Sequence, residues 1–520
     1  MVSGVVTEFR NESFLDYSRK EIREAMEEAL AEVAKKAGES YPLVIGGERI
    51  SPGQTFDSLN PSDPSQILGR FQKATPPLAG KALEAANDAF SSWSRTPAEK
   101  RANLLFRAAQ IMRDRRHTMN AWMVLEVGKS WAEADGETAE SIDFLEFYGR
   151  EMLRYAAGHP LTQVAGEENE LIYIPLGAGV VIPPWNFPNA ILCGMSSAAI
   201  VAGNTVVLKP SSDSPGVGYQ YMLIMEEAGV PAGVLNYLTG PGSLVGETLV
   251  GNPKTRFVAF TGSKAVGLGI NEKAAKAPPG QKWIKRVVVE MGGKDAIIVD
   301  KEANIDDAVQ GVLSSAFGYQ GQKCSACSRA IVDAAIYDEF LTKLRDSMST
   351  LKVGPTVVES NNVGPVINER AMKSILDYIE IGKGEGKVIA GGGQAEGDGY
   401  FVEPTVIQDV PEDARIAQEE IFGPVLAVIK ANDFDHALEI ANGTDYGLTG
   451  SVYTTNQEKI DRARDEFHVG NLYFNRKCTG AFVGAHPFGG FNMSGTDSKA
   501  GGRDYLLLFL QAKTISKKVG

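Results

Sequence analysis

Hydrophobic residues recur with a helical period in the first third of the chain. Residues 18–37 and most of residues 77–153 place Leu, Ala and Ile at this spacing opposite charged positions, which is typical of amphipathic helices. Ser18 is the expected N-cap of the first helix. Between the two stretches, residues 41–50 indicate a short strand, a turn and a second strand.

From Leu171 onward the pattern changes to short β-branched apolar runs. Most of them end in Gly, Pro, Ser or Asn, and helical stretches separate most of them. This pattern predicts βαβ units around a parallel sheet, on which ligands bind beyond the carboxyl ends of the strands. We expect a second α/β stretch from Asp295 to about Lys430, loops over the Gly-rich residues 471–502, and a terminal strand in the tail.

Length and charge narrow the class of protein. The chain has 520 residues, 43% of them hydrophobic, which is enough for a large core and roughly three domains. Its formal charge of −13 argues against a nucleic-acid partner and against an anionic membrane surface. The N-terminus lacks the basic and apolar regions of a secretory signal, no run of ~20 apolar residues occurs, and four cysteines are too sparse for a disulfide scaffold. We expect a cytoplasmic protein.

Two of the four cysteines lie in "YQGQKCSACSRA" as a C-x-x-C pair, Cys324 and Cys327. A structural zinc site needs about four ligands, usually in two pairs. The chain offers one C-x-x-C pair and five scattered histidines, so a zinc site is not favoured. A thioredoxin-like dithiol would follow an early strand of a small fold, whereas this pair lies deep in a long chain, so a redox dithiol is not favoured either. For Cys327 the favoured interpretation is a small buried hydrophobe. For Cys324 the neighbouring charge of Lys323 and the preceding glycine favour a nucleophile, because nearby positive charge lowers a thiol's pKa.

Two other segments offer partners for such a thiol. "PPWNFP" holds Asn186 between prolines at a strand end, as an oxyanion donor requires, although a lone Asn is usually a turn residue. "VVVEMGGK" ends an apolar strand in Glu290, which is either an ion-pair partner or a general base. The two glycines that follow leave space for a mobile carboxylate or a ligand.

These motifs, with "NTVVLKPS", "FTGS", "GQKCS" and "EEIFGPV", occur in the order seen in the NAD(P)-dependent aldehyde dehydrogenase superfamily, and the resemblance runs from about Tyr41 to Ala512. It implies that Cys324 attacks the aldehyde carbon. Asn186 and the Cys324 amide would stabilise the oxyanion, hydride would pass to a nicotinamide, and Glu290 would activate the water that cleaves the thioester.

The resemblance also implies a dinucleotide site, although the chain has no G-x-G-x-x-G after its first strand. Ser263 and the helix start at Val266 and Gly267 would face the pyrophosphate. Lys209 would bond the adenosine ribose, and Glu420 and Phe422 would hold the nicotinamide ribose and ring. The remaining expected contacts are Pro184, Trp185, Phe260, Gly262 and Gly292. Ser212 stands where NAD-selective members often carry a glutamate, so we expect NAD as the principal cofactor with NADP also accepted.

Four segments resemble one branch of the superfamily, the 1-pyrroline-5-carboxylate dehydrogenases, which oxidise L-glutamate γ-semialdehyde. They are residues 128–150, residues 318–330, residues 466–502 and the helix before "YPL". Consecutive amides at Gly480 and Ala481 would form a nest for the substrate carboxylate, with the Ser325 hydroxyl beside it. Glu140 would be the acidic contact, with Lys323 expected to pair with it, and Phe187 and Phe488 would wall the aliphatic chain. Glu140 and Phe488 are otherwise read as an ordinary helix ion-pair partner and a core residue.

The architecture implied by the resemblance is α/β. A Rossmann-type cofactor domain would take residues 1–157 and 175–289, and an α/β catalytic domain residues 290–482. A β oligomerisation arm at residues 158–174 would pair with the terminal strand in residues 496–520, giving a homodimer or a higher homo-oligomer. The resemblance to this branch also implies proline dehydrogenase as a partner.

Three alternatives stay open. The enzyme would act on another semialdehyde such as succinate semialdehyde; it would be a CoA-acylating relative, against which Glu290 argues; or it would be a non-catalytic binding or redox protein. Cys327 has no expected catalytic role, and if it contacts Cys324 the two would form a disulfide on oxidation.

Overall fold

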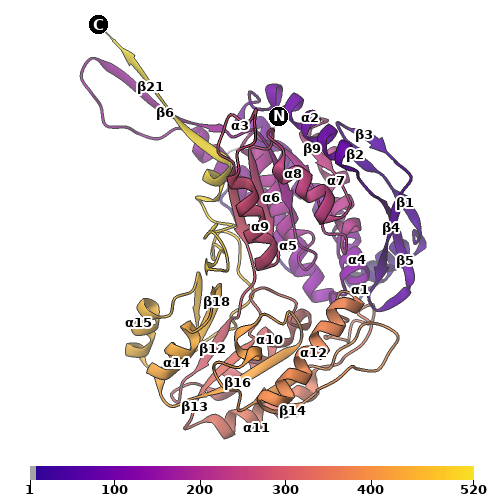
Figure 1. Cartoon of the computed structure of the whole chain (residues 1–520), viewed down its shortest axis with the longest axis vertical. Coiled ribbons are helices and arrows are strands. Elements are labelled where there is room, and N and C mark those ends of the chain that lie inside the picture. Colours follow the sequence, from indigo (N-terminus) through magenta and orange to yellow (C-terminus); the bar gives the residue numbers. More distant parts are fainter. Residues whose placement is uncertain (1–6, 520) are drawn as a thin grey trace.

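The computed structural model describes residues 7–519 and shows two lobes with a projecting ribbon (Figure 1). The expectation of no secretory signal rests partly on residues 1–6, which lie outside the described residues. Within the part of the chain that is described, no helix is both long and apolar enough to cross a membrane.

The first lobe is built on a seven-stranded sheet whose central strands are parallel, as the apolar runs predict. Its order is β11-β10-β7-β8-β9-β2-β3. The bounds are β2 Leu43–Ile45, β3 Glu48–Ile50, β7 Ala178–Ile182, β8 Thr205–Leu208, β9 Leu235–Tyr237, β10 Phe257–Thr261 and β11 Arg286–Glu290. β2 and β3 form the expected antiparallel hairpin. A small sheet of β1 Glu39–Tyr41, β5 Asp63–Gln72 and β4 Thr55–Asn60 lies at its flank.

Helices cover this sheet, so strands such as β8 are buried on both faces. The helices are α1 Lys20–Lys35, α2 Pro76–Trp93, α3 Ala98–Asp114, α4 Arg116–Val127, α5 Trp131–Ala156, α6 Ala190–Val201, α7 Pro215–Glu227, α8 Glu247–Gly251 and α9 Lys264–Ala275. The helical period thus identified α1 to α5 correctly. The expected N-cap was wrong: α1 follows Arg19, because the Ser18 hydroxyl donates instead to Asp16 Oδ1 at 2.6 Å.

The second lobe contains another seven-stranded sheet, in the order β14-β15-β16-β13-β12-β18-β19. Its strands are β12 Ala296–Val299, β13 Arg329–Asp333, β14 Lys387–Ala390, β15 Thr405–Gln408, β16 Val425–Ala431, β18 Thr449–Tyr453 and β19 Asn471–Phe474. The helices are α10 Ile305–Phe317, α11 Tyr337–Ser347, α12 Glu369–Glu385, α13 Arg415–Gln418, α14 Phe434–Asn442 and α15 Gln457–Glu466. The lobe extends past Lys430, and residues 471–474 are an edge strand rather than the expected loop.

The ribbon pairs β6 Glu167–Pro175 with β21 Leu510–Lys518 in antiparallel register, the pairing expected for the arm and the tail. The last seven positions of β21, from Ala512 to Lys518, are all exposed. Figure 1 shows it standing clear of both lobes.

The two large sheets contribute opposite strand ends to the space between them: the first sheet its carboxyl ends and the second its amino ends. Asn186, Lys209, Ser263 and Glu290 follow or end strands of the first sheet, so they lie at its carboxyl edge. Cys324 precedes β13, and the Glu420–Phe422 loop precedes β16, so the second sheet contributes its amino edge. The strand-end rule therefore holds for the first sheet and fails for the second.

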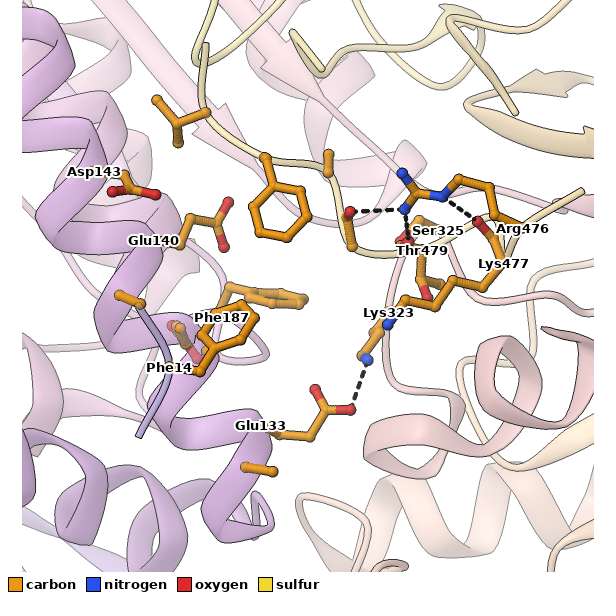
Figure 2. Close-up of a pocket in the computed structure, with 18 residues that line it drawn as sticks. Phe14, Glu133, Glu140, Asp143, Phe187, Lys323, Ser325, Arg476, Lys477 and Thr479 are labelled. Carbon is orange, nitrogen blue, oxygen red and sulfur yellow. Dashed lines mark hydrogen bonds and ion pairs between the residues drawn. The ribbon is translucent and has the colours of Figure 1, made fainter. Parts of the chain in front are cut away.

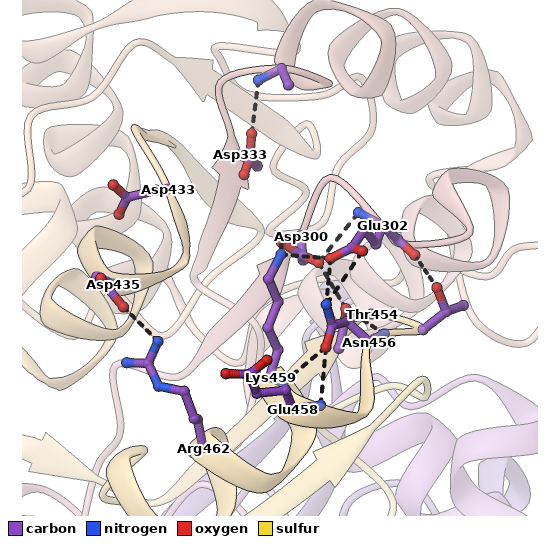
Figure 3. Close-up of polar contacts among 12 residues, drawn as sticks. Asp300, Glu302, Asp333, Asp433, Asp435, Thr454, Asn456, Glu458, Lys459 and Arg462 are labelled. Atoms are coloured by element: carbon purple, nitrogen blue, oxygen red, sulfur yellow. Dashed lines mark hydrogen bonds and ion pairs between the residues drawn. The ribbon is translucent and has the colours of Figure 1, made fainter.

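Polar residues at the carboxyl edge of the second sheet make contacts among themselves (Figure 3). Lys459 Nζ lies 2.6 Å from Asp300 Oδ1 and 2.8 Å from Glu302 Oε2, and Thr454 Oγ1 donates to Asp300 Oδ2 at 2.8 Å. The Lys459 ammonium thus neutralises Asp300 and Glu302, so these two carboxylates are not free to bind a cationic ligand.

Candidate active site

An inner cavity of about 130 Å³ lies between the two sheets. Cys324 from the second lobe and Glu290 from the end of β11 both line it. Of the expected substrate contacts, Glu140, Phe187, Ser325, Gly480, Ala481 and Phe488 line it as well. The structure therefore brings the proposed nucleophile, the proposed base and most of the proposed substrate residues around one space.

The Cys324 thiol is less activated than the sequence suggests. Burial raises its pKa well above the ordinary value, and the Asp295 and Glu420 carboxylates raise it further. The expected electrostatic help from Lys323 does not reach it, because Lys323 Nζ donates to Glu133 Oε1 at 3.0 Å. That contact also corrects the expected pairing of Lys323 with Glu140. Adjacency in sequence did not fix the direction of this long side chain.

Asn186 lies in the loop between β7 and α6 and is 4% exposed. Its Nδ2 donates to the Gln322 carbonyl at 3.0 Å, which ties this loop to the segment that leads into Cys324. A side-chain amide carries two N–H donors, so the second remains for an oxyanion.

Glu290 is held by the loop that follows β20 (Phe491–Asn492) and by the residues just before it. Its Oε1 accepts from Ser498 Oγ at 2.6 Å and its Oε2 accepts from the Gly490 amide at 3.3 Å. Burial raises its pKa to about 7, against the lowering effect of these hydrogen bonds. A carboxylate that titrates near neutrality can both take and return a proton.

The expected pyrophosphate site lies at the start of α9. Ser263 is its N-cap residue and is exposed, and Val266 is 52% exposed in the first turn. Gly267 is buried where a Cβ would lie 2.6 Å from Met291 Sδ, so a larger residue at this position would have to displace the Met291 side chain. The open N-terminus of a twelve-residue helix fits a phosphate group.

The remaining dinucleotide contacts converge on the same edge. Lys209 is 4% exposed, and within residues 7–519 its Nζ donates only to the adjacent Pro210 carbonyl at 3.2 Å. Burial lowers its pKa to about 8. Such a poorly satisfied buried ammonium fits a sugar hydroxyl or a phosphate. Ser212 is exposed three residues further on.

The nicotinamide end is framed by aromatic rings and a carboxylate. The rings of Trp185 and Phe422 meet edge to face with centroids 5.5 Å apart. Glu420 Oε1 accepts from the Gly293 amide at 3.1 Å, and its carboxylate fills the space where a side chain at Gly292 would stand. That space, expected to accommodate movement or a ligand, is thus occupied by Glu420. Pro184 belongs to the same loop as Trp185, and Phe260 and Gly262 lie at the end of β10, where Phe260 also lines the inner cavity.

A larger outer cavity of about 550 Å³ opens from the inner one (Figure 2). Both are lined by Glu140, Phe187, Ser325, Gly480 and Ala481, which therefore stand at their junction. Of these two cavities, Lys323 lines the outer one and not the inner one, together with Arg476 and Lys477.

At this junction one wall carries an acidic side chain and the other carries backbone amide donors. The pKa of Glu140 is raised to about 8 by burial and by the nearby Glu137 carboxylate. On the opposite wall, Gly480 has a φ of 76°, and among the described residues neither its amide nor that of Ala481 donates a hydrogen bond. Arg476 Nη2 donates to the Thr479 and Gly480 carbonyls, both at 2.9 Å, which fixes the loop with its amides free.

Cys327 points away from the active site. Its thiol is buried in the core of the second lobe, where burial and the neighbouring Cys478 raise its pKa. Cys478 is the thiol neighbour of Cys327 and all four cysteines are free here, so nothing in this arrangement supports the hypothesis of a Cys324–Cys327 disulfide. The interpretation of Cys327 as a buried hydrophobe is confirmed.

Several functional positions were missed from the sequence. The inner cavity is also lined by Phe144, Met195, Thr261, Ser498 and Tyr505, and the outer one by Phe14. Ser498 lies in a segment that the resemblance singled out, but nothing in its local pattern marks it as the partner of Glu290.

Comparison with known proteins agrees with this geometry. The model of the aldehyde dehydrogenase family matches residues 49–515. A 1-pyrroline-5-carboxylate dehydrogenase of Geobacillus kaustophilus is 55% identical over 513 residues, covering 99% of this chain and 100% of the relative. The crystal structure of a 1-pyrroline-5-carboxylate dehydrogenase from Thermus with bound NAD is 51% identical with a TM-score of 0.97, covering 99% of this chain and 100% of that one. Proline utilization A from Bdellovibrio bacteriovorus is 45% identical with a TM-score of 0.97 over 98% of this chain and 53% of that one.

Proposed function

The chain belongs to the aldehyde dehydrogenase family, and from this premise we propose that it oxidises L-glutamate γ-semialdehyde, the open form of 1-pyrroline-5-carboxylate, to L-glutamate with NAD. The observation that carries the proposal is the inner cavity, where Cys324 and Glu290 share one space at the end of a chamber with an acidic side chain on one wall and backbone amide donors on the other. Relatives more than 50% identical over the full chain carry the corresponding name.

In the first half of the reaction, the Cys324 sulfur attacks the aldehyde carbon. Because burial keeps the thiol protonated, a base has to remove its proton, and Glu290 in the same cavity has a pKa near 7. The free N–H of Asn186 and the amide of Cys324 then stabilise the oxyanion. Bound NAD supplies a hydride acceptor, and the product on the enzyme is a thioester of Cys324.

In the second half, after Glu290 has passed the thiol proton to solvent, its carboxylate takes a proton from water, which attacks the thioester carbon and releases the acid. Ser498 and the Gly490 amide orient this carboxylate. The Cys324 thiolate is the leaving group and is reprotonated for the next cycle.

The far end of the substrate carries an ammonium and a carboxylate. We propose that Glu140 pairs with the ammonium and that the free amides of Gly480 and Ala481, with the Ser325 hydroxyl, receive the carboxylate. The rings of Phe187 and Phe488 contact the methylene groups between the two ends.

We propose NAD as the principal cofactor, with NADP also used. Lys209, the α9 N-terminus and the Trp185–Phe422 pair support the dinucleotide site, and the exposed Ser212 places no carboxylate against a 2′-phosphate. We propose accordingly that the first lobe binds the cofactor and that the second lobe supplies the Cys324 thiol.

We further propose that the chain forms a homodimer or larger homo-oligomer through the ribbon of β6 and β21, whose exposed strands offer edges for pairing. Four free cysteines suit a cytoplasmic location. The similarity to proline utilization A supports proline dehydrogenase as a partner that delivers the substrate.

The test is NADH formation from a substrate panel. Wild type should oxidise L-glutamate γ-semialdehyde with a kcat/KM at least tenfold above that for succinate semialdehyde, which lacks the ammonium that Glu140 receives, and Cys324→Ala should be inactive with both. Equal use of the two semialdehydes, or turnover by Cys324→Ala, would contradict the proposal.

A further inference from the structure

An N-terminal segment, residues 7–17, lies across the mouth of the outer cavity. It precedes the part of the chain that the family model matches, and residues 7–16 contain no helix or strand. Phe14 from this segment lines the outer cavity together with α5 and the loop of residues 476–483 (Figure 2). A stretch outside the matched region thus supplies part of the wall of the substrate chamber.

The segment is fixed to α5 on both sides of Phe14. The Glu12 amide donates to Asp143 Oδ1 at 2.7 Å, and the Leu15 amide donates to Asp135 Oδ2 at 2.7 Å. Asp135 is 1% exposed and is held in turn by Arg116 through two hydrogen bonds of 2.7 and 2.8 Å. Backbone donors on buried carboxylates leave little freedom to the residues between them.

The same segment also contacts the opposite wall of the chamber. Asn11 Nδ2 donates both to Asp143 Oδ2 at 2.8 Å and to the Val483 carbonyl at 3.0 Å. The Phe14 ring stacks on that of Phe482, with centroids 6.2 Å apart and an interplanar angle of 27°. Phe482 follows Gly480 and Ala481 directly, so the segment joins α5 to the loop that carries the free amides.

We propose that this segment is a specificity element, with the Phe14–Phe482 pair limiting the size of the group that an incoming aldehyde carries at its amino end. The inference rests on the proposed function, because it places the ammonium end of the substrate at the junction near Glu140. The rings are 59% and 39% exposed, as expected at a mouth rather than in a core. A substituent on the substrate nitrogen would extend from the junction into the outer cavity, toward these rings.

The test compares Phe14→Ala and Phe14→Leu with wild type on three aldehydes: the free semialdehyde, its N-benzoyl derivative, and propanal, which is too short to reach the outer cavity. The kcat/KM ratio of the N-benzoyl derivative to propanal should rise roughly five- to fiftyfold in Phe14→Ala and less in Phe14→Leu. Phe9→Leu is the matched control, because Phe9 lies in the same segment but packs on Phe147 with centroids 5.1 Å apart.

An unchanged ratio in Phe14→Ala, or an equal rise in Phe9→Leu, would overturn the inference. If Phe14→Ala does not fold, Phe14→Leu is tested by alkylation of Cys324 with iodoacetamide and with its bulky fluorescein conjugate. Relative to wild type, the variant should show a higher ratio of the alkylation rate with the conjugate to the rate with iodoacetamide. A wild type that oxidises propanal but rejects the free semialdehyde would refute the proposed substrate alone. The size limit is then tested by the octanal to propanal ratio in the same variants.

Discussion

The ammonium of Lys129 is completely buried, and replacing it should affect both stability and catalysis. Its Nζ lies 3.1 Å from Glu137 Oε2, 4.1 Å from the centroid of the Phe187 ring and 3.9 Å from that of the Tyr319 ring. Phe187 follows Asn186, and Tyr319 lies on the segment leading to Cys324. Lys129 thus connects the two loops that hold the proposed reacting groups. The variant Lys129→Met keeps most of the volume and removes the charge.

The loss of folding stability in Lys129→Met depends on how well the remaining Glu137 carboxylate is satisfied. Breaking a buried ion pair by removing one partner costs about 3–5 kcal/mol. The remaining Glu137 is partly satisfied, since its Oε1 accepts from the amides of Asn189 at 2.7 Å and Ala190 at 3.0 Å, so the lower end applies. The two lost cation–π contacts add about 1 kcal/mol, because such terms overlap with the ion pair. We expect a loss of roughly 4 kcal/mol.

The assay is thermal unfolding followed by fluorescence, together with steady-state kinetics well below the transition. For a cooperative unit of the size of the first lobe, roughly 4 kcal/mol corresponds to a fall in Tm of about 8–12 °C. The double variant Lys129→Met/Glu137→Gln should recover part of this, because it removes the unpaired charge but keeps an acceptor for the two amides. In Lys129→Met, kcat should fall about tenfold with little change in KM for NAD, since misplaced loops affect the reacting geometry.

Lys459→Met is the control, because Lys459 pairs with the buried Asp300 at the far edge of the second sheet. It should lower stability and leave kcat unchanged. The reasoning is refuted if Lys129→Met unfolds within about 1 °C of wild type, if the double variant is no more stable than the single one, or if the control loses kcat equally.

The other predictions concern single groups in or beside the cavities. Burial raises the pKa of Glu290 to about 7, and the base must be ionised to act, so kcat should fall as pH drops through about 7. Glu290→Gln should lose this acidic limb of the pH profile. A profile in the variant identical to that of wild type would exclude Glu290 as the base. Glu140→Gln should raise KM for the semialdehyde about tenfold with no change for propanal, as expected for loss of an ammonium partner; an equal rise for both would show a structural role. Ser212→Glu should reduce kcat/KM with NADP by at least about tenfold and spare NAD, and a wild type that rejects NADP would already refute the premise.

Local patterns predicted much of the fold because the relevant forces are local. The helical period from residue 77 to residue 153 and the β-branched runs such as "TVVL" each follow from the burial of one face or of both faces. The strand-end position of Glu290 was predicted in the same way and is confirmed.

Long-range placement could not be predicted from such patterns. Lys323 precedes Cys324 in the chain, yet its flexible stem carries the ammonium to Glu133 on α5, a helix far away in sequence. Cys327 lies three residues after Cys324, but the turn between them directs its thiol to Cys478. The amino edge of the second sheet faces the first lobe because of how the lobes meet, and no periodicity within either lobe encodes that.

The pairing of β6 with β21 has a consequence for biosynthesis. β6 is translated well before β21, the strand that pairs with it. Until β21 has been translated, the early strand has exposed backbone groups, and it depends on chaperones or on its own charged residues to avoid wrong pairing. Any subunit contact that uses the paired ribbon can form only after β21 has been translated.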